Sequence, residues 1–158
     1  MNASRITDYL YISTRIGDED VEAIRDLDVR LIINMIAFVR PSPVLAELDV
    51  EVLWLGTFDF VLLPIPLRTL SRGVEAALPV IRQGGRVLVY CQAGRHRSVA
   101  MASAILIAMG YPAEQAMDLI VEKRPVADPR AWHIERQIRR FEKRWRRRHG
   151  SKGKGNDG

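Results

Sequence analysis

An apolar strand, a loop and an apolar helix follow one another between Val87 and Met109, and no other part of the chain restricts the fold as strongly. Val87–Tyr90 is continuously apolar, as is typical of a strand covered on both faces. Val99–Met109 is apolar on all sides, which predicts a helix at the centre of the molecule. The loop between them starts after Cys91 and contains Gly94. A chain that buries such a unit needs further helices and strands in layers around it.

The rest of the chain supplies those layers. Strand-like apolar runs occur at Ile6–Ser13, Leu31–Ile36, Val50–Leu55 and Arg86–Tyr90. Apolar residues at helical spacing predict a first helix capped by Asp18, a second over residues 67–81 with a kink at Pro79, a third from Pro112 to just before Pro125, and a last one over about 130–148. Strands that alternate with helices, followed by a run of helices, predict an α/β fold. Its central, mostly parallel sheet would have about four or five strands flanked by helices.

The composition is that of one globular domain. Of the 158 residues, 47% are hydrophobic and 27% charged, and these proportions exclude disorder for most of the length. The chain has one cysteine, so neither an intramolecular disulfide nor a cysteine-rich zinc module is possible. The start of the chain lacks the apolar core of a signal peptide, and the longest apolar run is too short to cross a bilayer. We therefore expect a cytoplasmic location with no transmembrane segment, and a monomer.

The net charge of +5 comes from one end of the chain. Residues 136–158 hold ten Lys or Arg and two Asp or Glu, whereas the remaining residues are slightly acidic. This asymmetry argues against nucleic-acid binding by the whole domain. The run Arg139–Arg148 is expected to be either the solvated face of a helix or a contact for an acidic partner, such as an anionic membrane or nucleic acid. Residues 150–158 are expected to form a flexible Gly/Lys-rich tail.

The loop after Cys91 has the features of a phosphate site. Its backbone amides can converge on one point at the positive end of the following helix, and Gly94 permits the torsions that such a curl needs. Arg97 can hold two phosphate oxygens with its planar guanidinium, and the same field should lower the pKa of the Cys91 thiol. A thiolate beneath a bound phosphate is an in-line nucleophile. The residues expected to line the phosphate are Gln92, Ala93, Gly94, Arg95, His96 and Arg97.

The alternative is a structural cysteine. A lone cysteine is usually a small buried apolar side chain, and arginine is so abundant here that its spacing from Cys91 alone says little. The combination of the apolar strand, Gly94, Arg97, Ser98 and the apolar helix is what favours the phosphate site.

These residues resemble the cysteine-dependent phosphatases, and most closely their small dual-specificity branch. Cys91-x-x-Gly-x-x-Arg-Ser98 is similar to the phosphate-binding signature of that family. Looser similarities extend over about residues 4–145, and they are carried by Arg5–Ser13, Leu31–Asn34, Arg124-Pro125, Trp132, Gln137 and Phe141-Glu142. The resemblance implies a protein-tyrosine-phosphatase-like fold, with a catalytic domain over residues 1–149.

The resemblance also implies a general acid and a helper for the leaving thiolate. Asp59 lies upstream of Cys91 at the place where the family carries its acid, and Phe58 and Phe60 could desolvate it and raise its pKa. The alternative for Asp59 is a solvated turn residue. Ser98 would stabilise the Cys91 thiolate as it leaves the phosphocysteine intermediate, or it would cap the helix, and both roles can hold together.

One position departs from the family pattern. Tyr90 stands where the family has a histidine that orders the loop and lowers the thiol pKa. His96 is expected to point outward rather than to replace that histidine. No metal or other cofactor is expected, and His133 and His149 are expected to have no ligand-like partners.

The family implies hydrolysis of phosphotyrosine and phosphoserine/threonine through a phosphocysteine intermediate. Arg95, His96, Arg68 and Arg72 could favour a polyanion instead, either a phosphoinositide or an RNA 5′-triphosphate, although a solvated rim is the simpler explanation of these residues. The third hypothesis is a phosphate-binding module without turnover. Nothing in the catalytic set Cys91, Arg97 and Asp59 is missing, which argues against that hypothesis.

Overall fold

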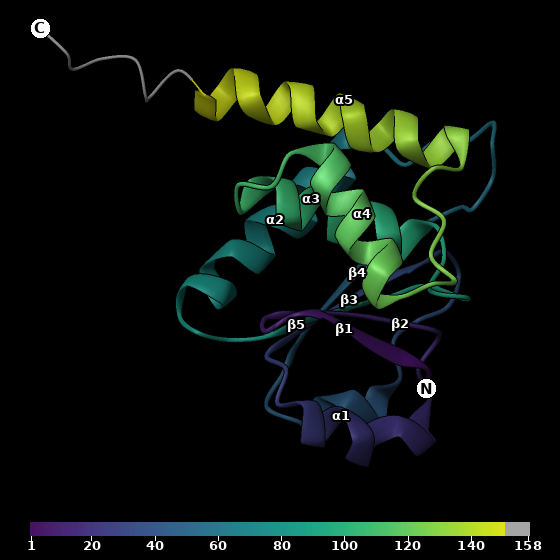
Figure 1. Cartoon of the computed structure of the whole chain (residues 1–158). Helices are drawn as coiled ribbons and strands as arrows, with labels where there is room; N and C mark the ends of the chain where they lie inside the picture. The colour runs from purple at the N-terminus through teal and green to yellow at the C-terminus, as the bar shows by residue number, and fades with distance from the viewer. Residues whose placement is uncertain (151–158) are drawn as a thin grey trace, which may run out of the picture.

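The computed structural model describes residues 1–150 and forms three layers, with a sheet between two layers of helices (Figure 1). The sheet has five strands in the order β1-β2-β5-β3-β4. Their bounds are β1 Ala3–Thr7, β2 Leu10–Ser13, β3 Leu31–Ile36, β4 Glu51–Thr57 and β5 Val87–Tyr90. All neighbours pair in parallel except β1 with β2. The predicted α/β fold with a mostly parallel sheet is therefore confirmed. Most of the predicted tail lies outside the described residues.

The first expected strand is wrong, because Ile6–Ser13 belongs to two strands. The chain turns after Thr7, and β1 and β2 pair as an antiparallel hairpin in which Thr7 lies opposite Leu10. The Thr7 hydroxyl accepts a hydrogen bond from the Tyr9 amide at 3.3 Å, a local side-chain bond that favours a turn over continued strand. The hairpin makes β1 the edge of the sheet.

The helices lie on both faces of the sheet. Of the α-helices in residues 1–150, α1 (Val21–Leu27) alone is on one face, and the other face carries α2 (Leu67–Arg82), α3 (Arg97–Ala108), α4 (Ala113–Lys123) and α5 (Trp132–His149) (Figure 1). Short 3₁₀ helices occupy Asp18–Asp20 and Pro43–Glu47.

One helix prediction needs correction. Asp18 does not cap α1, because the 3₁₀ turn separates it from Val21; its carboxylate instead accepts a hydrogen bond from Ser42. The α2 helix, predicted over residues 67–81, spans Leu67–Arg82 and contains Pro79. Pro79 lies in the last turn of the helix. Proline has no backbone N–H, but at this position few helical hydrogen bonds follow the one that it cannot make.

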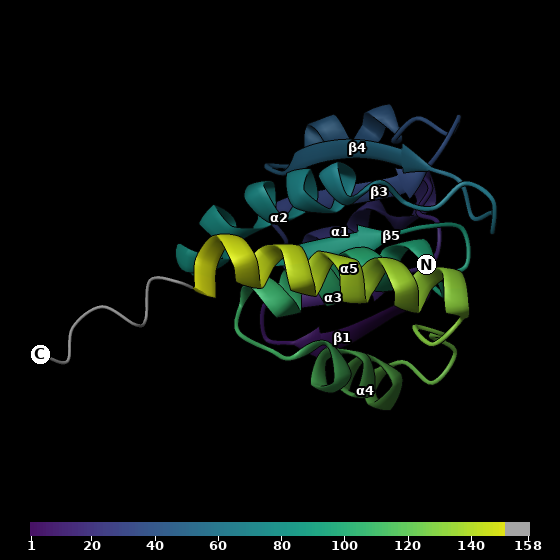
Figure 2. The same ribbon diagram turned by 90° about the horizontal axis from the view of Figure 1, so that it is seen from above.

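The α3 helix lies at the centre of the molecule, as its sequence predicted. Its residues from Ser98 to Ile107 are all buried between the sheet and the outer helices. The α5 helix crosses over it (Figure 2). Ile134, Ile138 and Phe141 of α5 are buried. Because β4 and β5 are parallel, their carboxyl ends open on the same edge of the sheet as the start of α3. This edge is where α/β folds commonly bind ligands. No helix of the described residues is long and apolar enough to cross a membrane.

Candidate functional site

The Cys91 loop joins the end of β5 to the start of α3. Cys91 is 2% exposed and follows the last residue of the strand directly, and the helix begins at Arg97. Both ends of the loop are therefore fixed by fully buried elements. Neither end can move without disturbing the core.

The backbone carbonyls of the loop are held on its outer side. Four successive carbonyls accept hydrogen bonds from segments packed around the loop: Gln92 from the Arg15 amide at 3.2 Å, Ala93 from Arg124 Nη2 at 3.4 Å, Gly94 from Arg124 Nε at 2.8 Å, and Arg95 from the Asp128 amide at 3.0 Å. A peptide unit whose carbonyl points outward directs its N–H inward. The loop therefore presents converging amides at the amino end of α3, an arrangement that attracts an anion.

Arg124 is the main support of the loop from behind. Its side chain is 1% exposed, and besides the loop carbonyls it donates to the Asn2 carbonyl at 3.2 Å and to the Ser4 hydroxyl at 2.9 Å. Gly94 allows this close approach, since a Cβ there would lie 2.5 Å from Arg124 Nη2 and 2.8 Å from the Ser13 carbonyl oxygen. Gly94 also has a φ of +61°, which L-residues rarely adopt. The sequence pattern pointed to the glycine, but it assigned Arg124 no role in the loop.

Cys91 lies where the loop favours its ionised form. Burial alone would raise the pKa of its thiol, but the Ser98 hydroxyl, the amides of Ser98 and Arg95, and the charge of Arg97 together lower the pKa below its ordinary value. The Cys91 Sγ and Ser98 Oγ atoms are 3.2 Å apart. The lowered pKa agrees with the direction expected from the sequence. Ser98 is completely buried inside the first turn of α3, where His96, not Ser98, is the N-cap residue.

Arg97 lies at the start of α3, and only part of its guanidinium group has a hydrogen-bond partner in the described residues. Its Nη1 donates to the carbonyl of Thr57, the last residue of β4, at 2.8 Å. Its Nε is buried and has no hydrogen-bond partner within residues 1–150. Buried polar groups in proteins are normally paired, so an unpaired guanidinium N–H beside converging amides indicates a place for an oxyanion.

Asp59 lies just beyond β4 and faces two histidines. Its carboxylate oxygens are 2.9 Å from His96 Nδ1 and 3.4 Å from His133 Nε2. Partial burial tends to raise the pKa of Asp59, but the bonds to the histidines and the charge of Arg97 outweigh burial and lower it. The expected upward shift is therefore wrong. Phe58 and Phe60 are 44% and 52% exposed, too open to desolvate the carboxyl group between them.

His96 and His133 also differ from the sequence expectations. His96 does not point outward: its side chain is 20% exposed, it contacts Asp59, and its Nε2 is 3.5 Å from Asp128 Oδ2. His133, near the start of α5, has both Asp59 and His96 as ligand-type neighbours. The expectation that it lacks such neighbours is wrong. The sequence held no signal for this, because His133 is 74 residues from Asp59 and only the fold joins them.

Tyr90 is part of the core. It is 1% exposed, and burial raises its pKa to about 12, against smaller opposing effects of Arg15 and Asn34. Its phenol is therefore neutral and supplies no positive charge to the thiol, unlike the histidine that the family pattern has there. Of the basic residues expected near the loop, Arg95 extends outward, with a side chain 58% exposed and 3.8 Å from Asp128. Arg68 and Arg72 are exposed on α2.

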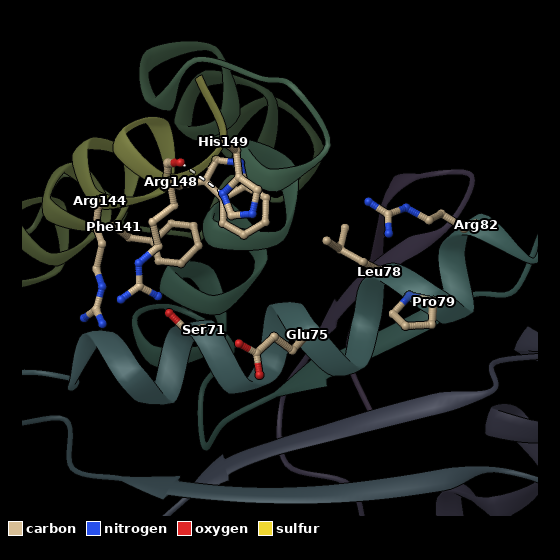
Figure 3. Close-up of a pocket in the computed structure, with 10 residues that line it drawn as sticks. Ser71, Glu75, Leu78, Pro79, Arg82, Phe141, Arg144, Arg148 and His149 are labelled. Atoms are coloured by element: carbon tan, nitrogen blue, oxygen red, sulfur yellow. Dashed lines mark hydrogen bonds between the residues drawn. The ribbon is translucent and has the colours of Figure 1, made fainter. Parts of the chain in front are cut away.

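A groove lies elsewhere on the molecule, between α2 and α5. It encloses about 310 Å³, and its lining residues are Ser71, Glu75, Leu78, Pro79, Arg82, Phe141, Arg144, Trp145, Arg148 and His149. Figure 3 shows Arg144 and Arg148 extending from α5 toward α2. No residue of the Cys91 loop lines this groove, so it is separate from the site built around Cys91.

Comparison with known proteins places the chain in a family. Residues 10–144 match the model described as the dual specificity phosphatase catalytic domain. The chain therefore belongs to the dual specificity phosphatase family, a class of cysteine-based phosphatases, as its loop and fold indicated.

Individual relatives agree with this assignment. The chain is 46% identical over 63 residues to dual specificity protein phosphatase 1 of Arabidopsis thaliana, a match covering 39% of this chain and 31% of the relative. It is 41% identical over 79 residues to phosphatidylglycerophosphatase and protein-tyrosine phosphatase 1 of Rattus norvegicus, covering 49% and 40%. These matches thus span less than half of each relative's length. The crystal structure of PTPMT1 superposes with a TM-score of 0.82 at 27% identity, covering 94% of this chain and 99% of that one.

Proposed function

We propose that this protein hydrolyses phosphomonoesters of proteins, both phosphotyrosine and phosphoserine/threonine, through a phosphocysteine intermediate. The observation that carries the proposal is the geometry of the Cys91 loop. Its carbonyls are tied outward, so that its amides and the unpaired Nε of Arg97 surround a thiol whose pKa is lowered. The residues proposed to bind the phosphate are Gln92, Ala93, Gly94, Arg95, His96 and Arg97.

In the first step the Cys91 thiolate attacks phosphorus. The bond between phosphorus and the leaving oxygen breaks, and that oxygen takes a proton from the protonated form of Asp59, a minor species at neutral pH because the pKa of Asp59 is lowered. The loop amides and Arg97 stabilise the charge that develops on the phosphoryl oxygens. The products of this step are the free alcohol and a phosphocysteine.

In the second step a water molecule attacks the phosphocysteine. The ionised Asp59 accepts a proton from that water, and the sulfur–phosphorus bond breaks to release phosphate and the thiolate. The Ser98 hydroxyl, 3.2 Å from the sulfur, stabilises the departing thiolate. The position of Asp59 supports this proposal, because Asp59 follows β4 closely and the last residue of β4, Thr57, accepts a hydrogen bond from Arg97.

A phosphoinositide or another lipid phosphomonoester is the second candidate substrate. Arg95 exposes most of its side chain beside the loop, where it can meet a further negative charge. One relative is named a phosphatidylglycerophosphatase, and PTPMT1 has been solved in complex with PI(5)P. An RNA 5′-triphosphate would use the same exposed arginine, but no contact in the described residues favours it over a lipid.

We also propose a catalytic domain over residues 1–149 and a cytoplasmic location. The described fold continues through α5 to His149, which supports the domain boundary. A nucleophilic thiol needs a reducing compartment, because oxidation inactivates it. Cell fractionation with a tagged full-length chain tests the location.

Replacement of the nucleophile tests the proposal. The wild-type chain should hydrolyse p-nitrophenyl phosphate in the presence of EDTA, and vanadate should inhibit it. Cys91→Ser should abolish turnover but still bind vanadate, because the loop amides and Arg97 remain in place. A phosphate-binding module without turnover would show binding in both forms and hydrolysis in neither. Persistent hydrolysis by Cys91→Ser would refute the nucleophile assignment.

A panel of substrates separates the two candidates. Initial rates on phosphotyrosine peptides, phosphoserine peptides, phosphoinositides and RNA 5′-triphosphate should be measured under one set of conditions. The proposal expects the peptides to give the highest kcat/KM. An Arg95→Ala variant should lower kcat/KM on phosphoinositides more than on peptides if the exposed arginine recognises a second phosphate.

A further inference from the structure

Three metal-ligating side chains meet at the rim of the site. Asp59 comes from the segment after β4, His96 from the Cys91 loop and His133 from α5, and one ligand atom of each lies within 4.8 Å of those of the other two. Asp59 is the shared member, 2.9 Å from His96 Nδ1 and 3.4 Å from His133 Nε2. Three separate segments thus bring together two imidazoles and one carboxylate.

This donor set suits a zinc-like cation. Imidazole nitrogen and carboxylate oxygen bind Zn²⁺ at about 2.0–2.2 Å, and tetrahedral ligands at that distance are about 3.3–3.5 Å from one another. The distance from Asp59 Oδ1 to His133 Nε2, 3.4 Å, matches that spacing, and the distance from Asp59 Oδ2 to His96 Nδ1, 2.9 Å, is somewhat shorter. Small rotations of side chains at the protein surface would bring all three atoms onto one ion and leave its fourth position open to solvent or substrate.

The surroundings of His96 support the same interpretation. A histidine that binds a metal through one ring nitrogen usually directs the other at a carboxylate or carbonyl. His96 Nε2 is buried, lacks a hydrogen-bond partner within the described residues, and lies 3.5 Å from Asp128 Oδ2. Asp128 is fixed in turn, because its amide donates to the Arg95 carbonyl at 3.0 Å. This arrangement leaves His96 Nδ1 facing Asp59 and His133.

We propose that Asp59, His96 and His133 form a binding site for a divalent cation of the zinc class, and that occupation of this site inhibits the phosphatase. This departs from the expectation of a site that holds no metal. The inhibition rests on the proposed function, in which Asp59 donates a proton to the leaving oxygen. A carboxylate bound to a cation cannot carry that proton, so the Cys91 loop would still bind phosphate while turnover is suppressed.

Cobalt binding tests the site independently of activity. Co²⁺ added to the full-length chain should give the visible absorption of a tetrahedral or five-coordinate ion, and Zn²⁺ should displace it. His133→Gln and His96→Ser should each weaken binding by at least about 10²-fold. His149→Gln is the matched control, because His149 lies at the far end of α5 and bonds the Trp145 carbonyl. Equal affinity in His133→Gln and His149→Gln would overturn the site.

Cys91 is the competing ligand, so its variant completes the test. Cys91→Ser should bind Co²⁺ as tightly as the wild type, and the wild-type spectrum should lack the ultraviolet band of a cobalt–thiolate bond. Such a band, or loss of binding in Cys91→Ser, would place the cation on the sulfur and overturn the proposal.

Inhibition is measured separately on p-nitrophenyl phosphate and on a phosphoserine peptide. Zn²⁺ should inhibit with a midpoint equal to its measured Kd, EDTA should reverse it, and His133→Gln should be at least about 10²-fold less sensitive than His149→Gln. Binding at the three residues without inhibition would overturn the inhibitory role and the acid role of Asp59, but not the cation site. An inactive wild type that binds Co²⁺ would refute the proposed function alone.

Discussion

The two halves of the proposed site are built in opposite ways. The Cys91 loop lies between a buried strand and a buried helix, with four carbonyls tied to its supports. The segment after β4 that carries Asp59 is open, and Leu62 in it is 76% exposed. The proposed nucleophile is thus part of the core, whereas the proposed acid is positioned by side-chain contacts with His96 and His133. Substitutions in the two halves should therefore have different effects. In the loop they should disturb phosphate binding and lower stability, whereas at Asp59 they should impair proton transfer.

The largest effect is expected at Arg97. Arg97→Lys keeps the charge but loses the planar group that bonds Thr57 and presents Nε to the site. We expect kcat to fall about 10³-fold on every substrate, since removal of one transition-state donor typically costs about 10²–10³-fold. Steady-state kinetics on p-nitrophenyl phosphate measure this loss. Arg68→Lys is the control, because Arg68 is exposed on α2, and its kcat should match that of the wild type. An Arg97→Lys variant with the wild-type kcat would contradict the proposed binding of two phosphate oxygens by Arg97.

Asp59→Asn should affect only the proton transfer. We expect kcat to fall about 10²-fold on a phosphoserine peptide, whose alkoxide leaves poorly, and much less on p-nitrophenyl phosphate, whose phenolate needs little protonation. The ratio of the two rates measures the effect, and Tm should stay near that of the wild type. Asp49→Asn, an exposed carboxylate at the other end of β4, is the control. An equal loss on both substrates would show that Asp59 acts on the phosphate and not on the leaving group.

Arg124→Met should reveal the support of the loop. The variant removes the donors to the Gly94 and Ala93 carbonyls and leaves buried acceptors without partners. We expect the free energy of unfolding to fall by about 2–3 kcal/mol. For a domain of this size that lowers Tm by roughly 5–10 °C. Calorimetry measures this, with the exposed Arg72→Met expected to change stability by no more than about 0.5 kcal/mol. An unchanged Tm would mean that the loop supports itself.

The contrast between the buried Cys91 loop and the open segment around Asp59 also explains which parts of the site could be predicted from the sequence. The strand and helix around Cys91 were predicted to within two residues at each boundary, because burial on all sides leaves a continuous apolar run. Gly94, Arg97 and Ser98 lie between the apolar strand and the apolar helix, so their places in the loop and at the start of the helix followed from those two elements. The loop is local in sequence, so its geometry follows from elements whose pattern is visible.

The surroundings of Asp59 could not be predicted in this way. Its partners are 37 and 74 residues distant, and apolar periodicity reports which face of an element is buried, not which polar groups meet across it. The expected upward pKa shift relied on the neighbouring Phe58 and Phe60, which the fold leaves exposed. Arg124 was visible as part of a motif, but its bonds to the loop depend on how α4 ends against β1. The hairpin at Thr7 was missed because Thr7 and Asp8, polar residues that favour a turn, were included in one strand-like segment.

The smallest effect is expected at Ser98, and it tests whether the loop itself sets the ionisation of the thiol. Ser98→Ala removes one of the donors that lower the pKa of Cys91, so the pKa should rise and less thiolate should be present at any pH below it. Because a more basic thiolate is also a better nucleophile, kcat/KM on the acidic side should fall only about threefold. Thiolate absorbance measures the shift directly, since Cys91 is the only cysteine in the chain. Ser103→Ala is the control: Ser103 is equally buried in α3, but its hydroxyl bonds the Val99 carbonyl. If both variants raised the pKa alike, the effect would come from packing of α3 rather than from the hydrogen bond to sulfur.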